Sequence, residues 1–155
     1  MPIAVESPDE LEGRSEVLYG AFLAGAALAS AGSGLHHKIC HILGGAYNLP
    51  HAEMHAIVLP HVVAFNEPAS PTSMERMARA IESRNAAIGL YDLAKRIGAP
   101  TALKDIGMKE ENLEHAVSFI LEKAPYKNPQ SVDEASIRAL LMNAYTGRRP
   151  EGVHN

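Results

Sequence analysis

Apolar residues in this chain recur every three or four positions, which is the period of an amphipathic α-helix. The pattern is clearest over residues 87–97 and 113–121. No segment alternates apolar and polar residues as a half-buried strand does. The pattern therefore predicts an all-α chain, a multi-helix bundle of about seven helices.

Capping residues predict where the first two helices begin and end. Ser7-Pro8-Asp9-Glu10 combines a capping hydroxyl, a proline at the first helical position and a glutamate three residues after the cap. The helix that follows becomes small and apolar on all sides before Gly32, as expected of a helix enclosed by others. A second helix is predicted over residues 35–43, with its end at Gly44-Gly45.

Proline and capping residues predict the helices and loops in the rest of the chain. A helix is predicted from residue 50 to 65, with a kink or break at Pro60. A loop over residues 66–73 then precedes a helix over 74–81. Ser131 and Glu134 match a capping box that opens the last helix.

Length and composition indicate the number of domains, the kinds of binding partner and the cellular compartment to expect. The 155 residues fit a single domain, 1–155, and a net charge of −4 with 14 Lys and Arg gives no basic footprint for nucleic acid. One cysteine is typical of a reducing compartment, which predicts a cytoplasmic protein. Residues 17–35 lack charge but are rich in Ala, Gly and Ser, so a membrane span is not expected. The acidic N-terminus also excludes an export signal.

The unusual feature is a cluster of histidines. Six of the eight lie in one 26-residue stretch: His36, His37, His41, His51, His55 and His61. On helices, His37 and His41 share one face, and His51 and His55 share another, so two helices in contact would bring four imidazoles together. Imidazoles bind metals and transfer protons near neutral pH, and the spacing leaves both uses open.

Other candidate residues receive a structural interpretation. His61 and His115 are expected to be packing residues, and Cys40 is expected to fill apolar space. Glu53 points away from the face shared by His51 and His55, so the segment is not a zinc-protease motif. The sequence contains no glycine-rich loop that would hold a nucleotide pyrophosphate.

The segments Gly34-Leu-His-His-Lys-Ile-Cys-His-Ile-Leu-Gly-Gly45 and Leu49-Pro-His-Ala-Glu-Met-His55 resemble the iron-containing alcohol dehydrogenase superfamily. Their Gly-Leu-His-His-Lys opening and Pro-His-Ala-Glu-x-His continuation are most similar to its maleylacetate reductase branch. The resemblance implies the C-terminal all-helical domain of a two-domain homodimeric enzyme, similar to that of dehydroquinate synthase. NADH or NADPH would then bind mainly to an N-terminal nucleotide-binding domain that is absent here, and no cofactor-binding residue is identified in this chain.

The resemblance also implies roles for individual residues. His37 and His51 match two metal ligands, for iron or zinc, while the remaining ligands belong to a preceding segment. Ala52 replaces the family's glycine, and maleylacetate reductases work as a branch without bound iron, so metal use stays open. His41 matches the histidine near the nicotinamide, so His41 and His37 are the candidate catalytic residues. The dicarboxylate substrate would be bound by His36, Lys38 and His55.

The activity that this resemblance implies is the reduction of maleylacetate to 3-oxoadipate in the degradation of aromatic compounds. Two alternatives are kept: a metal-dependent alcohol dehydrogenase domain, and a helical module that binds a partner or a metal without catalysis.

Overall fold

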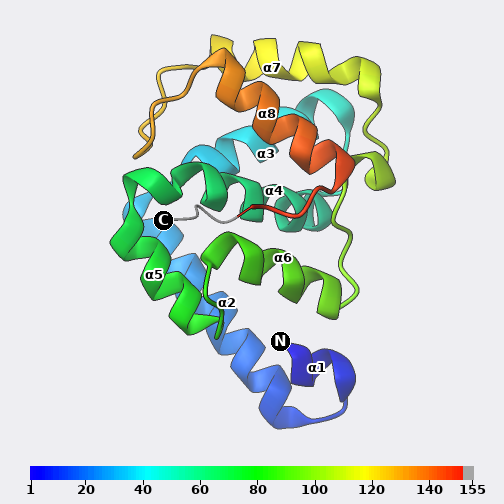
Figure 1. Ribbon diagram of the computed structural model, residues 1–155. Coiled ribbons are helices and arrows are strands. Elements are labelled where there is room, and N and C mark those ends of the chain that lie inside the picture. Colours follow the sequence, from blue (N-terminus) through cyan, green and yellow to red (C-terminus); the bar gives the residue numbers. More distant parts are fainter. Residues whose placement is uncertain (152–155) are drawn as a thin grey trace.

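The computed structural model describes residues 1–151 and confirms the all-α fold (Figure 1). This part of the chain contains no strand. Its α-helices are α1 (Pro2–Glu6), α2 (Leu11–Ala31), α3 (Leu35–Tyr47), α4 (His51–Asn66), α5 (Pro71–Ala80), α6 (Ala86–Arg96), α7 (Leu113–Glu122) and α8 (Glu134–Thr146). Short 3₁₀ helices lie between them: η1 (Glu67–Ala69), η2 (Leu103–Ile106) and η3 (Glu110–Asn112). The pattern missed α1, because five residues are too few to show a helical period.

The central element of the bundle is α4. It packs against α3, α6 and α8, and eight of its 16 residues are buried. The helix runs unbroken through Pro60, so the predicted break at this residue is wrong. Proline removes one main-chain hydrogen bond from a helix interior. Packing against three neighbouring helices offsets this loss.

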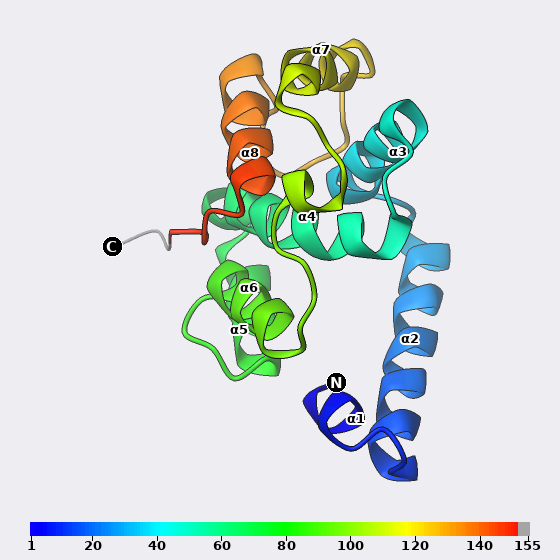
Figure 2. The ribbon, with the colours of Figure 1, turned by 90° about the vertical axis from the view of Figure 1, so that its right-hand side faces the viewer.

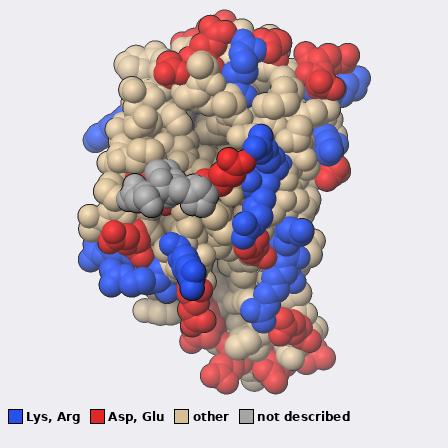
Figure 3. All heavy atoms as spheres, in the orientation of Figure 1, with Lys and Arg blue, Asp and Glu red and all other residues tan. Residues whose placement is uncertain are grey.

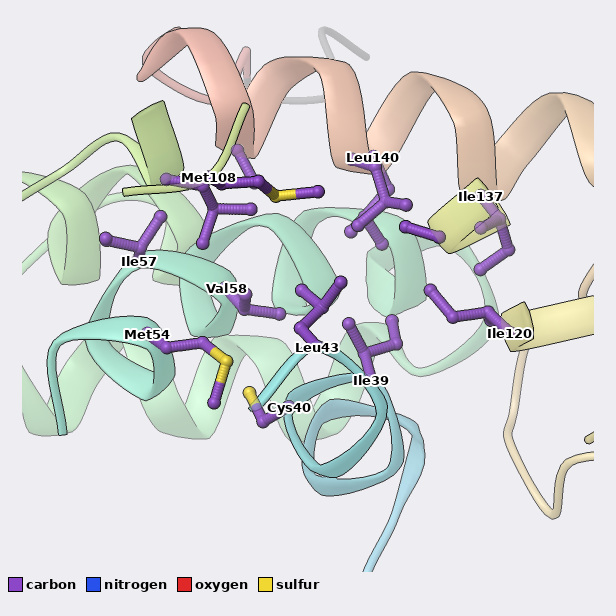
Figure 4. Packing of buried hydrophobic residues seen from close by; sticks show 14 of the residues in the cluster. Ile39, Cys40, Leu43, Met54, Ile57, Val58, Met108, Ile120, Ile137 and Leu140 are labelled. Atoms are coloured by element: carbon purple, nitrogen blue, oxygen red, sulfur yellow. The ribbon is translucent and has the colours of Figure 1, made fainter. Parts of the chain in front are cut away.

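The main hydrophobic core lies where α3, α4, α7 and α8 meet (Figure 4). Ile39 and Leu43 of α3 are completely buried, and Figure 4 shows them facing residues of α4, α7 and α8. Burial of one such side chain contributes about 1.5–3 kcal/mol relative to leaving it exposed. The core therefore fixes α3 against α4, and these two helices carry the clustered histidines.

The glycines in α3 do not end the helix. It continues past Gly44-Gly45 to Tyr47, and Asn48 ends it in a left-handed conformation with φ 50°. A Cβ on Gly44 would lie 3.2 Å from the Cε atom of Met54, so this glycine permits the close approach of α4. The predicted helix end at residue 43 is therefore wrong.

Three predicted helix starts are also wrong. Ser7 ends α1 by donating its amide to the Ile3 carbonyl, and α2 begins only at Leu11. The capping box of α8 is formed by Asp133 and Ser136 instead of Ser131 and Glu134. Both pairs have the three-residue spacing of a capping box, and aspartate caps a helix as well as serine does. In addition, α5 begins at Pro71 rather than residue 74.

Helix α2 stands away from the bundle (Figure 2), so the prediction of an enclosed helix is wrong within this chain. Gly13 is its one buried residue, and α1 packs closely on it, since a Cβ there would lie 3.0 Å from a methyl carbon of Ile3. Large apolar side chains of α2 are exposed: Leu11, Leu18, Tyr19, Phe22, Leu23 and Leu28. The helix thus presents apolar surface that nothing in residues 1–151 covers.

Within the described residues, no single helix has the length and hydropathy needed to cross a membrane. Helices α2 and α3 have this length and hydropathy only when they are taken together, and a bend of 98° separates them. On the face seen in Figure 3, Lys and Arg side chains are interspersed with Asp and Glu.

Candidate active site formed by clustered histidines

Five imidazoles come together where α3 and α4 meet, and we refer to His36, His37, His41, His51 and His55 as the imidazole cluster. The ring centre of His55 lies 4.8 Å from that of His36, 5.1 Å from that of His37 and 4.3 Å from that of His51. The rings of His37 and His41 are 6.3 Å apart. The predicted convergence of two helical pairs is therefore present, and His36 joins it.

A hydrogen bond between His36 and His55 holds the buried side of the cluster together. The Nε2 atom of His36 lies 3.1 Å from the main-chain oxygen of His55 and donates a proton to it in the tautomer that carries hydrogen there. Burial is the main cause that lowers the pKa of His36, and it also lowers the pKa of His55 to about 4. Four neighbouring imidazoles add to the effect on His55. Both rings are therefore neutral at neutral pH.

The Nε2 atom of His55 is buried and has no hydrogen-bond partner among the described residues. Leaving such an atom unpaired costs roughly 1–3 kcal/mol. This unpaired nitrogen can bind a ligand atom, a proton or a metal ion.

The other side of the cluster is accessible. His41 and His51 are exposed and His37 is half-buried. His41 also lines two hollows on the surface. An accessible imidazole at the edge of a pocket is suited to general acid–base catalysis, and His41 has this position.

Whether the imidazole cluster can bind a metal ion depends on how many ligand atoms converge in it. Imidazole nitrogens are good ligands for iron and zinc, but catalytic sites usually have three protein ligands. The ring centres of His37 and His51 lie 5.1 and 4.3 Å from that of His55, but among the described residues neither belongs to a group of three converging ligand atoms. A different group, His36, Cys40 and His55, has its ligand atoms within 4.8 Å of one another.

Cys40 argues against that second group. Its side chain is completely buried in the core beside Met54 (Figure 4). Burial raises the pKa of the Cys40 thiol to about 12, whereas a metal-binding cysteine is a thiolate. Its position agrees with the predicted role as apolar filler.

Lys38, which is predicted to bind substrate together with His36 and His55, lies at a surface pocket. It lines this pocket, of about 530 Å³, together with His41, Lys123 and Lys127. We refer to this site as the lysine pocket. Lys123 and Lys127 follow α7 in the sequence, 82 and 86 residues after His41, so no local spacing could associate them with the cluster.

The remaining histidines lie elsewhere. His61 is 4% exposed within α4, and burial lowers its pKa to about 4. His115 is exposed on α7, where its Nδ1 atom is 3.1 Å from the Tyr47 hydroxyl. Neither side chain belongs to the imidazole cluster. His61 is a buried packing residue as predicted, whereas His115 is exposed.

With the fold and the cluster established, comparison with known proteins identifies the class. The sequence model described as "Fe-containing alcohol dehydrogenase family, C-terminal" matches residues 1–145. The chain therefore belongs to the iron-containing alcohol dehydrogenase family and corresponds to its C-terminal part.

Within this family, the chain is similar to maleylacetate reductases and to an iron-containing alcohol dehydrogenase. A maleylacetate reductase of Burkholderia cepacia is 49% identical over 144 residues, which cover 93% of this chain and 41% of the relative. The crystal structure of maleylacetate reductase from Rhizobium sp. strain MTP-10005 is 41% identical with a TM-score of 0.91, covering 96% of this chain and 42% of that one. An iron-containing alcohol dehydrogenase from Corynebacterium glutamicum is 47% identical with a TM-score of 0.90, covering 96% and 42%. The chain thus spans about two fifths of the length of these relatives.

Proposed function

We propose that this chain is the substrate-side domain of a maleylacetate reductase, which reduces maleylacetate to 3-oxoadipate with NADH or NADPH. One observation carries the proposal: His41, an accessible histidine of the imidazole cluster, also lines a pocket that contains three lysines. A dicarboxylate that must receive a proton needs both features. The similarity to maleylacetate reductases agrees with this substrate class.

The proposal includes a division of labour between domains. Residues 1–155 form one all-helical domain, and a nucleotide-binding domain outside this chain holds most of the nicotinamide cofactor. The exposed apolar side chains of α2 support this division, because large exposed apolar patches mark interaction surfaces. Leu18 and Phe22 are 73% and 67% exposed, as expected of residues that another domain or a second subunit covers in the complete enzyme.

The residues of this chain supply a proton and bind the carboxylates. When bound, NADH or NADPH would supply the hydride that the carbon–carbon double bond of the substrate receives at the carbon farther from the ketone. His41 donates a proton to the carbon next to the ketone, so the product gains one hydride and one proton. His37, whose ring centre lies 6.3 Å from that of His41, passes a proton from solvent to His41 and so restores its acid form, and Lys38 binds a carboxylate.

A metal ion, where one is used, would be held by His37 and His51 with further ligands from outside this chain. It would polarise a carbonyl oxygen as a Lewis acid. The reduction described above needs only the hydride donor and an acid, so the proposal assigns His37 and His51 as metal ligands without making metal a requirement.

The purified chain tests the division between domains. With NADH and maleylacetate, we expect no decrease in NADH absorbance above that of a protein-free control. Rapid turnover by this chain alone would contradict the proposal. Metal-dependent oxidation of simple alcohols, after fusion to a nucleotide-binding domain, would instead favour the alcohol dehydrogenase alternative.

A further inference from the structure

The lysine pocket lies between the start of α3 and the segment that follows α7. Lys38 and His41 come from α3, and Lys123 and Lys127 come from the other wall. Its volume of about 530 Å³ lies within the roughly 300–1,000 Å³ typical of small-molecule pockets. Two segments far apart in the sequence thus form one site.

The charge of this pocket is positive and uncompensated. No Asp or Glu lines it, and none of its three lysines forms an ion pair with a described residue. Converging like charges repel each other, and a bound anion relieves that repulsion. The chain as a whole carries a net charge of −4, so this local excess of positive charge does not follow from composition.

The position of His41 connects the pocket to the imidazole cluster. Lys38 and His41 are three residues apart on α3, so their side chains lie on neighbouring turns of one face. An anion held by the lysines therefore lies next to the accessible imidazole. A dicarboxylate carries a second charged group, so one carboxylate can bind among the lysines while the rest of the molecule lies in the same pocket as His41.

We infer that Lys123 and Lys127, together with Lys38, bind a carboxylate group of the substrate and determine the preference for dicarboxylates. This inference rests on the proposed function, since it assigns residues to the same substrate. A phosphate group of the nucleotide shares the chemistry of an anionic oxygen ligand, so the experiment includes it as a separate arm. The carboxylate is favoured because the pocket includes the proposed proton donor.

The experiment is isothermal titration calorimetry on the 155-residue chain with three probes: adipate, inorganic phosphate and NADH. We compare the unchanged chain with the double variant Lys123→Gln, Lys127→Gln, and with Lys104→Gln as a control outside the pocket. All three lysines are exposed, so we expect the variants to keep the melting temperature of the parent chain.

We expect adipate to bind more tightly than phosphate or NADH. The double variant should weaken adipate binding at least tenfold, the control should change it less than twofold, and added NaCl should weaken it. Absence of adipate binding, or equal affinity in the double variant, would overturn the inference. Tighter binding of phosphate or NADH that depends on Lys123 and Lys127 would assign the pocket to the nucleotide and also overturn it.

These outcomes are separate from a test of the proposed function. Turnover of maleylacetate by a complete enzyme that contains this chain, with adipate binding unaffected by the double variant, would refute the inference alone. Lysine-dependent adipate binding without any turnover in such an enzyme would refute the proposed function alone.

Discussion

The side chain of His36 on α3 is hydrogen-bonded to the main-chain oxygen of His55 on α4, across 3.1 Å. This bond joins the two helices at the buried side of the imidazole cluster. It keeps the ring of His36 within the cluster and away from solvent.

Replacing His36 by alanine should lower the free energy of unfolding by about 1 kcal/mol, because it removes this hydrogen bond and the packing of the ring. Urea denaturation at neutral pH measures the change. His41→Ala is the matched control, since it removes an exposed imidazole of the same cluster. Equal stability of the two variants would show that the bond between α3 and α4 contributes nothing measurable.

The buried imidazole of His61 predicts a pH dependence of stability. Burial lowers its pKa to about 4 in the folded chain, against about 6.5 for an unperturbed histidine. Between these values the unfolded chain binds a proton that the folded chain does not, so the free energy of unfolding falls as the pH decreases from 6.5 to 4. Above pH 6.5 the contribution of His61 is constant. The loss over this window is on the order of 3 kcal/mol.

His61→Leu should remove the contribution of His61 to that pH dependence and leave that of His55, whose pKa burial also lowers to about 4, while stability at neutral pH stays nearly unchanged. Urea denaturation at several values between pH 4 and 7.5 compares it with the parent chain, and His115→Leu serves as the exposed control. A variant whose stability still falls by the same amount below pH 6.5 would assign the effect to other groups.

Substitution of two leucines should change stability by very different amounts. Leu43 is completely buried in the main core, so Leu43→Ala should cost roughly 2–5 kcal/mol. Leu18 on α2 is 73% exposed, so Leu18→Gln should change stability by about 0.5 kcal/mol or less. Thermal and urea unfolding measure both. A large loss with Leu18→Gln would mean that α2 is packed in solution, as in self-association of the chain.

The single cysteine should be unreactive in the folded chain. Cys40 is completely buried and burial raises its pKa to about 12, so little thiolate is available. With a coloured disulfide reagent, we expect a much slower reaction in buffer than in denaturant, where one thiol per chain should react. Equally fast reaction under both conditions would place Cys40 at the surface.

The sequence predicted those features that depend on local periodicity. The all-α class and the convergence of His37 with His55 follow from helical spacing. The helices continue through Gly44 and Pro60, because tertiary packing outweighs the tendency of these two residues to end a helix. Competing capping signals explain the misplaced starts of α2 and α8, since several residues near each end can serve as caps.

The second wall of the lysine pocket could not be predicted in the same way. Lys123 and Lys127 reach His41 only because α7 packs against α3, which is a contact between residues distant in sequence. The exposure of α2 was also unpredictable, because a small apolar helix has the same sequence pattern whether its covering surface belongs to this chain or to another.

A chimeric enzyme tests the central claim most directly. This chain replaces the matching 144 residues of the Burkholderia cepacia reductase, and NADH oxidation is followed with maleylacetate as substrate. We predict clear turnover that His41→Ala reduces about 10²-fold or more and that His115→Ala leaves within twofold. Absence of turnover by the folded chimera, or full turnover in the His41→Ala variant, would contradict the assignment of this chain as the proton-donating, substrate-side domain of a maleylacetate reductase.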